Sequence, residues 1–100
     1  MEKKKASYEL RAIKATFATV ATLRMGTTAQ STAIALGFSM QDVVDIIQSI
    51  TSAMFYKSMT TYADPTVWQD VYHVPSTAGM LYVKFQRDCD GHIVIQFKEK

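Results

Sequence analysis

The chain has 100 residues, a net charge of +2 and one cysteine, Cys89. This length suits one domain with one core, and 48% hydrophobic with 20% charged residues excludes a disordered chain. A single cysteine cannot form an internal disulfide, so a reducing, cytoplasmic compartment is expected. Glu9, Arg11 and Lys14 interrupt the apolar stretch at 6–23, which argues against a signal peptide or membrane span there.

Positive charge is concentrated at the N-terminus, where residues 1–24 hold six basic and two acidic side chains. Such a segment can attract a polyanion. The alternative is a solvated face that keeps the protein soluble, and for the lysine run alone this second interpretation is favoured.

The first half of the chain, about 7–52, is predicted to be helical. A first helix is expected from Tyr8 to Leu23, with Ser7 as its N-cap and Gly26 at its end. Helical spacing places apolar residues on one face of it, namely Leu10, Ile13, Phe17 and Val20.

Two further helices have clearer boundaries. One is predicted from Thr28 to Leu36, stopped by Gly37. The next begins at a capping box formed by Ser39 and Asp42. It continues as an apolar stripe typical of a core helix, made of Met40, Val43, Val44, Ile47 and Ile50.

The second half, about 54–98, is predicted to be rich in strands. Aromatic and β-branched runs indicate four of them, at 54–61, 67–74, 80–87 and 92–98. Asp64-Pro65 marks one turn, and Pro75 and Gly79 bracket a loop. Apolar and polar residues alternate in the last two strands, so one sheet face is apolar. The expected fold is one α+β domain, 1–100, with its helices packed on one face of an antiparallel sheet.

The last hairpin allows its register to be predicted. Both apolar sets must lie on the same face, which a three-residue loop at 89–91 satisfies with Gly91 in the left-handed position. This loop pairs Tyr82 with Lys98, beside Lys84 and Gln96, with Cβ atoms of opposed residues about 5 Å apart.

A phenol beside ammonium groups can take part in acid–base catalysis. Cations favour the phenolate, and they stabilise the negative charge that develops at a reacting phosphate. RNA carries its own nucleophile, the 2′-hydroxyl, so cleavage needs only proton transfer, charge stabilisation and positioning. The alternative is an ordinary cross-strand Lys–Tyr pair on a wet surface.

The remaining polar candidates give weaker signals. His73 and His92 suit an acid–base pair, but the strand assignment puts them at opposite ends of the sheet, with His73 near Tyr82. His92 lies near Asp88, Cys89 and Asp90, which could suggest a metal site. No second histidine or cysteine stands near, so a hairpin turn is favoured and no metal is expected. Trp68 is expected to pack, whereas exposed tyrosines can stack a base, the candidates being Tyr56, Tyr62 and Tyr72.

Four motifs resemble the MqsR family of bacterial toxins: Phe55-Tyr-Lys-Ser-Met-Thr-Thr-Tyr62, Val67-Trp-Gln-Asp-Val-Tyr72, Leu81-Tyr-Val-Lys84 and Phe97-Lys-Glu-Lys100. The resemblance covers the chain from about Phe55 onward, and more loosely the helical half. It implies a compact fold similar to the RelE and YoeB ribonuclease toxins. It also implies a metal-independent, cofactor-free mRNA endoribonuclease with GCU preference, neutralised by an MqsA-like antitoxin or a family-specific substitute.

The resemblance assigns roles to residues in these motifs. It implies that Lys57 and Lys98 stabilise charge, that Gln69 orients the substrate and that Tyr82 transfers a proton. It further implies that Tyr56 contacts a base. The strand assignment independently places only Tyr82 and Lys98.

Two more candidates are expected to bind substrate, Lys84 and His73. Two departures from the family pattern affect sequence preference or antitoxin fit rather than catalysis. Pro65 follows Asp64 where many members have histidine, and Gln96 stands where many have serine.

Two alternatives belong to other functional classes. One is an RNA-binding module without catalysis, and the other is an interaction protein whose basic segment meets an acidic partner. Incubation with mRNA in chelator separates them, because only a ribonuclease releases new 5′-hydroxyl ends.

Overall fold

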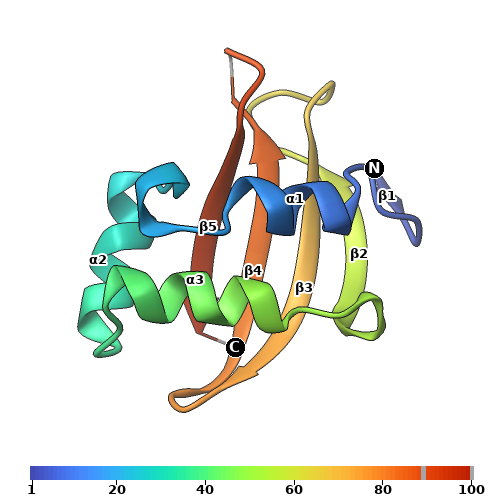
Figure 1. The fold of residues 1–100 in the computed structure, drawn as a ribbon. Coiled ribbons are helices and arrows are strands. Elements are labelled where there is room, and N and C mark those ends of the chain that lie inside the picture. The colour runs from blue at the N-terminus through green and yellow to red at the C-terminus, as the bar shows by residue number, and fades with distance from the viewer. Residues whose placement is uncertain (89, 100) are drawn as a thin grey trace.

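The computed structural model of the chain describes residues 1–88 and 90–99, so Cys89 and Lys100 lie outside the described residues. Its elements, in chain order, are β1 (Glu2–Lys3), α1 (Leu10–Thr16), the 3₁₀ turn η1 (Val20–Thr22), α2 (Thr27–Ala35), α3 (Met40–Ser49), the 3₁₀ turn η2 (Ser52–Met54), β2 (Phe55–Thr60), β3 (Trp68–Ser76), β4 (Gly79–Arg87) and β5 (Ile93–Glu99) (Figure 1). The strands form one antiparallel sheet in the order β1-β2-β3-β4-β5. The α+β prediction is therefore confirmed.

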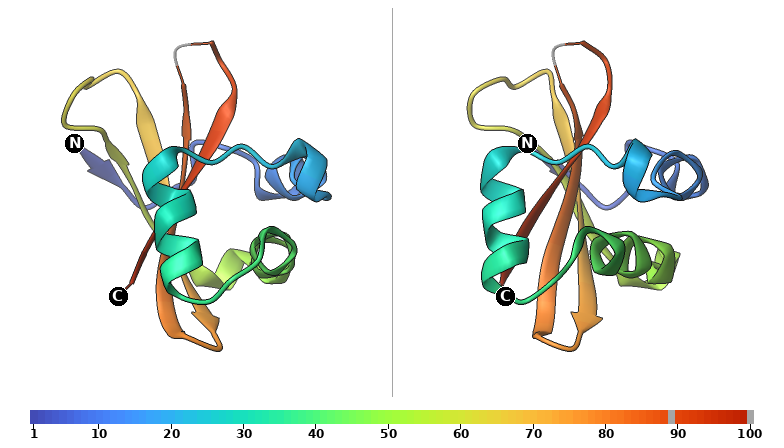
Figure 2. Two further views of the ribbon diagram at one scale, coloured as in Figure 1. Left: turned by 90° about the vertical axis from the view of Figure 1, so that its left-hand side faces the viewer. Right: turned by 60° about the vertical axis from the view of Figure 1, so that its left-hand side comes forward.

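The helices do not all lie on one face of the sheet. Helices α1 and α3 cover one face, whereas α2 runs beside the β5 edge (Figures 1 and 2). The prediction of a single helical layer is thus wrong for α2. Its buried residues are the small Ala29 and Ala33, while Ile34 stays exposed, so α2 has no broad apolar stripe to lay on the sheet.

The core lies between the sheet and the α1–α3 layer. Its largest fully buried side chains include Phe17, Ile47, Tyr72, Phe85 and Ile95. The opposite face of the sheet, called the open face below, is formed by alternate residues of β2 to β5 and is lined mainly by polar side chains. None of the helices in the described part of the chain combines the length and apolar character that crossing a bilayer requires.

The first helix is shorter than predicted. It ends at Thr16, and Val20 lies in an exposed 3₁₀ turn instead of on the buried face. The Gln48 side chain donates to the carbonyls of Lys14 and Phe17, 2.7 and 3.3 Å away, and so satisfies the helix end there. Gly26, predicted to end this helix, is instead the N-cap of α2.

Ser7 is also not an N-cap, because Glu9 occupies that position. The Ser7 amide donates to both carboxylate oxygens of Asp70 at 3.0 Å, and the Tyr8 amide donates to Asp70 at 2.9 Å. The Ser7 and Ser58 hydroxyls are 2.9 Å apart. Asp70 is fully buried, so this carboxylate anchors the N-terminal segment to β3.

The other two helices agree with prediction. Helix α2 differs by one residue at each end, and Gly37 after it has a φ of 82°. Helix α3 has the predicted capping box: the Asp42 amide donates to the Ser39 hydroxyl at 3.1 Å, and the Ser39 amide donates to the Asp42 carboxylate at 2.9 Å.

The predicted strands are present, with two differences. β3 and β4 continue to Ser76 and Gly79, which pair with each other, so the expected loop is a tight turn and Pro75 lies within the strand. β1 was not predicted, since two residues are too short for a recognisable pattern.

The predicted register of the last hairpin is confirmed. Tyr82 is opposite Lys98 and Phe85 is opposite Ile95, while the Asp88 amide donates to the His92 carbonyl at 2.8 Å. Gly91 has a φ of 82°, the left-handed conformation required of it. Cys89, the first loop residue, is outside the described part.

One irregularity shapes the open face. Phe55 pairs with Tyr72 and Lys57 pairs with Val71, which leaves Tyr56 as the extra residue of a β-bulge in β2. The Phe55 ring packs edge-on against the core residue Tyr72, 5.5 Å between centroids. The bulge therefore lets both Tyr56 and Lys57 face the open side.

Candidate active site on the open face of the sheet

The residues predicted to act in catalysis or to bind substrate lie on the open face, namely Tyr56, Lys57, Gln69, His73, Tyr82, Lys84 and Lys98. Cross-strand pairing sets these side chains in adjacent rows. The first row holds Tyr56, His73, Tyr82 and Lys98; the second Lys57, Val71, Lys84 and Gln96; the third Met59, Gln69, Gln86 and Val94.

The first row is an aromatic ledge that ends in an ammonium group. The Tyr56 ring stacks on the His73 ring with centroids 4.3 Å apart and planes 27° apart. The Tyr82 ring meets the other side of His73 edge-on at 4.8 Å, and Lys98 is directly opposite Tyr82. The expectation that His73 lies at the Tyr82 end is confirmed. This arrangement fixes the Tyr82 phenol and leaves part of the Tyr56 ring exposed.

Lysines surround the phenol. Burial lowers the pKa of Lys84, and the positive charges of Lys98 and Lys57 lower it further. Lys57 in turn is close enough to interact electrostatically with Tyr56 and Tyr82. The ammonium groups of Lys57, Lys84 and Lys98 together create a positive field suited to an oxyanion such as phosphate.

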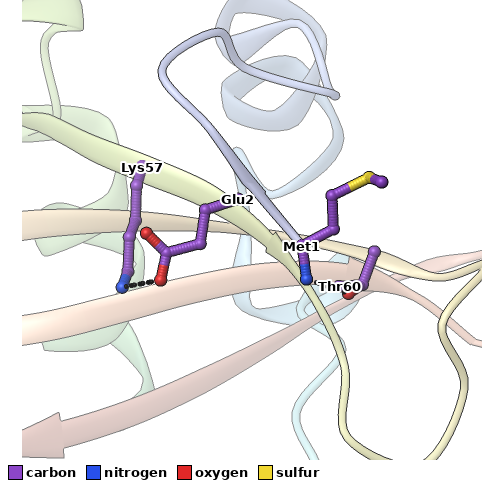
Figure 3. Close-up of polar contacts among 4 residues, drawn as sticks. All are labelled: Met1, Glu2, Lys57 and Thr60. Carbon is purple, nitrogen blue, oxygen red and sulfur yellow. Dashed lines mark hydrogen bonds and ion pairs between the residues drawn. The ribbon is translucent and has the colours of Figure 1, made fainter.

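Lys57 has a partner that the sequence did not reveal. Its Nζ lies 2.8 Å from a carboxylate oxygen of Glu2, on the adjacent strand β1 (Figure 3). The hydrogen bond and the opposite charge raise the pKa of Lys57 and lower that of Glu2. The α-amino group of Met1 donates to Thr60 Oγ1 at 3.1 Å beside this pair. The N-terminal strand thus brings a carboxylate to the edge of the site.

Gln69 is held by other amides. It is only 8% exposed, and its Nε2 donates to the Oε1 atoms of Gln86 at 2.8 Å and Gln96 at 3.3 Å. Gln96, where many family members carry serine, is therefore part of the support for Gln69. A side chain fixed in this way orients neighbouring groups.

Part of the basic N-terminal segment also packs on aromatic rings. Lys3 Nζ is 4.1 Å from the Trp68 ring centroid, and Lys4 Nζ is 5.1 Å from that of Tyr56. Lys4 thus adds positive charge at the aromatic ledge. Sequence patterns gave no signal for Glu2 and indicated Lys4 only as part of the basic N-terminal segment, because both reach the site through the pairing of β1 with β2.

Other candidates are separated from this site. Tyr72 is buried in the core, which raises its pKa to about 12, so it is not available to stack a base. Tyr62 is fully exposed in the loop between β2 and β3. His92 lies in the hairpin turn beyond β4, far along the sheet from His73.

The hairpin turn brings Asp88, Asp90 and His92 together, with potential ligand atoms within 4.8 Å of one another. Asp88 Oδ1 accepts hydrogen bonds from the amides of Asp90 and His92, both at 2.9 Å, and these bonds lower its pKa. This is the geometry of a turn stabilised by its own carboxylate.

Comparisons with known proteins agree on one family. A family model described as motility quorum-sensing regulator, toxin of MqsA, matches residues 5–99. A relative from Escherichia coli (strain K12), named mRNA interferase toxin MqsR, is 40% identical over 65 residues. The aligned segment spans 65% of this chain and 65% of the relative. With nearly its whole length matched by the family model, the chain belongs to the MqsR toxin family.

Proposed function

We propose that the protein is the toxin of a type II toxin–antitoxin system, a metal-independent endoribonuclease that cleaves mRNA and so arrests translation and growth. Family membership and the name of the E. coli relative support this proposal. The observation that carries it is the Tyr82–Lys98 pair beside His73, with Lys57 and Lys84 in the adjacent row.

The cleavage is a transesterification within RNA. The ribose 2′-oxygen attacks the adjacent phosphorus as its proton is removed, and the bond from phosphorus to the 5′-oxygen breaks. The departing 5′-oxygen takes up a proton, so the products are a 2′,3′-cyclic phosphate and a 5′-hydroxyl, and neither water nor a cofactor is consumed. Tyr82 is proposed as the group that moves a proton, while Lys57 and Lys98 stabilise the phosphorane-like charge and Gln69 orients the reacting groups. Ammonium groups thus supply the positive charge that other nucleases take from a divalent ion.

Substrate binding is proposed for the rest of the face. The exposed part of the Tyr56 ring, stacked on His73, offers a platform for a base next to the scissile phosphate. Lys84 lies between the other lysines and is proposed to hold the phosphate. Cleavage at GCU is the preference expected from the family. Gln96 and Pro65 depart from the family pattern, so they are the positions most expected to change the cleavage sequence of this chain.

The proposed toxin binds an antitoxin protein. Its matching family is described as the toxin of MqsA, so an MqsA-like antitoxin or a functional equivalent is proposed to neutralise this chain. The α+β architecture supports a fold similar to RelE and YoeB, and mRNA as the proposed substrate supports a cytoplasmic location.

The test is incubation with mRNA in chelator, followed by mapping of the ends. New 5′-hydroxyl ends, lost when one 2′-hydroxyl is replaced by hydrogen at the cleaved nucleotide, support the proposal. RNA that is retarded but intact would instead support the binding-module alternative. A strict requirement for divalent ions would refute the mechanism.

A further inference from the structure

We infer that the groove between α2 and β5 is a second RNA-binding subsite, which holds the sugar–phosphate backbone of the nucleotides beside the scissile phosphate. The inference rests on the proposed ribonuclease function and extends it to a surface that begins at Lys98 and continues beyond the predicted catalytic residues.

The groove consists of two adjoining cavities at the β5 edge. One, of about 480 Å³, is lined by Thr28, Thr32, Lys84, Gln96, Phe97, Lys98 and Glu99. The second, of about 320 Å³, shares Thr28, Gln96 and Phe97 and continues toward Gly26 and Val94. Volumes of this size are in the range of small-molecule sites.

The fold holds α2 at a fixed distance from the sheet. The Ile95 amide donates to the Arg24 carbonyl at 3.0 Å, and Met25 forms a parallel bridge with Ile95 just before α2 begins. Ala29 and Ala33 then turn their small side chains inward. Figure 2 shows α2 running beside the β5 edge over most of its length. The groove is therefore part of the fold, not a chance gap.

Its chemistry matches an RNA backbone. Lys84 and Lys98 line the groove and also belong to the candidate site, so an RNA strand whose phosphate lies at Tyr82 can continue into the groove. The Thr28 hydroxyl and the amide of Gln96 are typical partners for phosphate and sugar oxygens. Thr32 Oγ1 donates to the Thr28 carbonyl at 3.0 Å and can still accept a hydrogen bond from a sugar hydroxyl. Such contacts position RNA and do not read its sequence. Continuity with the catalytic lysines favours RNA over an acidic protein segment.

The test uses Thr28→Glu, with Ser31→Glu as its matched control. Thr28 is exposed and lines both cavities, whereas the exposed Ser31 on the same helix lines neither. Both variants add one negative charge to α2, and a carboxylate in the first helical turn favours the helix, so Thr28→Glu is expected to fold.

Binding is measured by fluorescence anisotropy with RNA whose cleaved nucleotide carries 2′-deoxyribose. A short RNA spans the cleaved dinucleotide only, and longer RNAs add nucleotides on either side. We expect Thr28→Glu to weaken binding of RNA extended on one side by on the order of tenfold, because the added charge repels phosphate. Binding of the short RNA should change less than about twofold, and Ser31→Glu should match wild type with both.

Two results would overturn the inference. One is an equal effect of Thr28→Glu and Ser31→Glu at every RNA length. The other is unchanged RNA binding together with weaker antitoxin binding, which would assign the groove to the protein partner. Cleavage of unmodified RNA is followed separately. If wild type cleaves RNA but Thr28→Glu weakens binding equally at every RNA length or not at all, only the proposed groove is refuted. If Thr28→Glu weakens binding of the longer RNA alone but wild type does not cleave, only the proposed ribonuclease function is refuted.

Discussion

Replacement of Tyr82 by phenylalanine is the sharpest test of the proposed chemistry. The substitution removes one hydroxyl and keeps the ring that packs 4.8 Å from His73, opposite Lys98. Tyr82 is only partly buried, so the loss should change the free energy of unfolding by less than about 1 kcal/mol. KM should change little, because the ring and the lysines that hold the phosphate remain.

The expected loss is in kcat. Proton transfer by a positioned side chain contributes about 10²- to 10⁴-fold, equivalent to roughly 3–5 kcal/mol of the activation free energy. The assay is cleavage of a fluorophore–quencher oligoribonucleotide in chelator, at substrate concentrations on both sides of KM. Tyr62→Phe, at a fully exposed loop position, is the control and should retain wild-type kcat. A folded Tyr82→Phe protein with less than a tenfold loss would show that this phenol does not move the proton.

Further predictions concern stability, affinity and pH. Asp70→Asn should lower the free energy of unfolding by about 3 kcal/mol, because a buried carboxylate that accepts hydrogen bonds from backbone amides loses its charge. Urea denaturation measures this change. An equal effect from Asp45→Asn, at an exposed position, would contradict the prediction. Glu2→Gln should tighten binding of uncleavable RNA about two- to fivefold, because Lys57 is released from its ion pair; unchanged or weaker anisotropy-measured affinity would argue against competition at that ammonium. Burial and neighbouring ammonium groups lower the pKa of Lys84 below its usual 10.5, so an activity that needs this proton falls as pH rises through a window below 10.5. Lys84→Arg stays protonated and should move the alkaline decline of kcat/KM upward, and an identical pH profile would exclude this role.

Sequence patterns predicted those parts of the molecule that local chemistry determines. The Ser39–Asp42 capping box and the Tyr82–Lys98 register both follow from side-chain types at short spacing, and both were found as expected. The end of α1 depends instead on Gln48, a residue far along the chain that binds the Lys14 carbonyl. Such tertiary contacts override helix periodicity.

The candidate site shows the same division. The hairpin argument placed Tyr82 beside Lys98, and strand order placed His73 near them. Lys57 could not be placed from the residues alone, because its orientation depends on the bulge in β2, and Glu2 joins it only through a two-residue strand. A pattern of alternating residues contains neither kind of information.

The bulge at Tyr56 makes the spacing of this segment as important as its composition. Deletion of Phe55, for example, would restore strict alternation and turn the Tyr56 ring, which now stacks on His73, toward the protein interior, however well every remaining side chain were preserved. Length variation is thus forbidden in β2, whereas the exposed connection around Tyr62 is free of that restriction. Engineered insertions that keep an active toxin should therefore be recovered in the loop between β2 and β3 and not within 55–57.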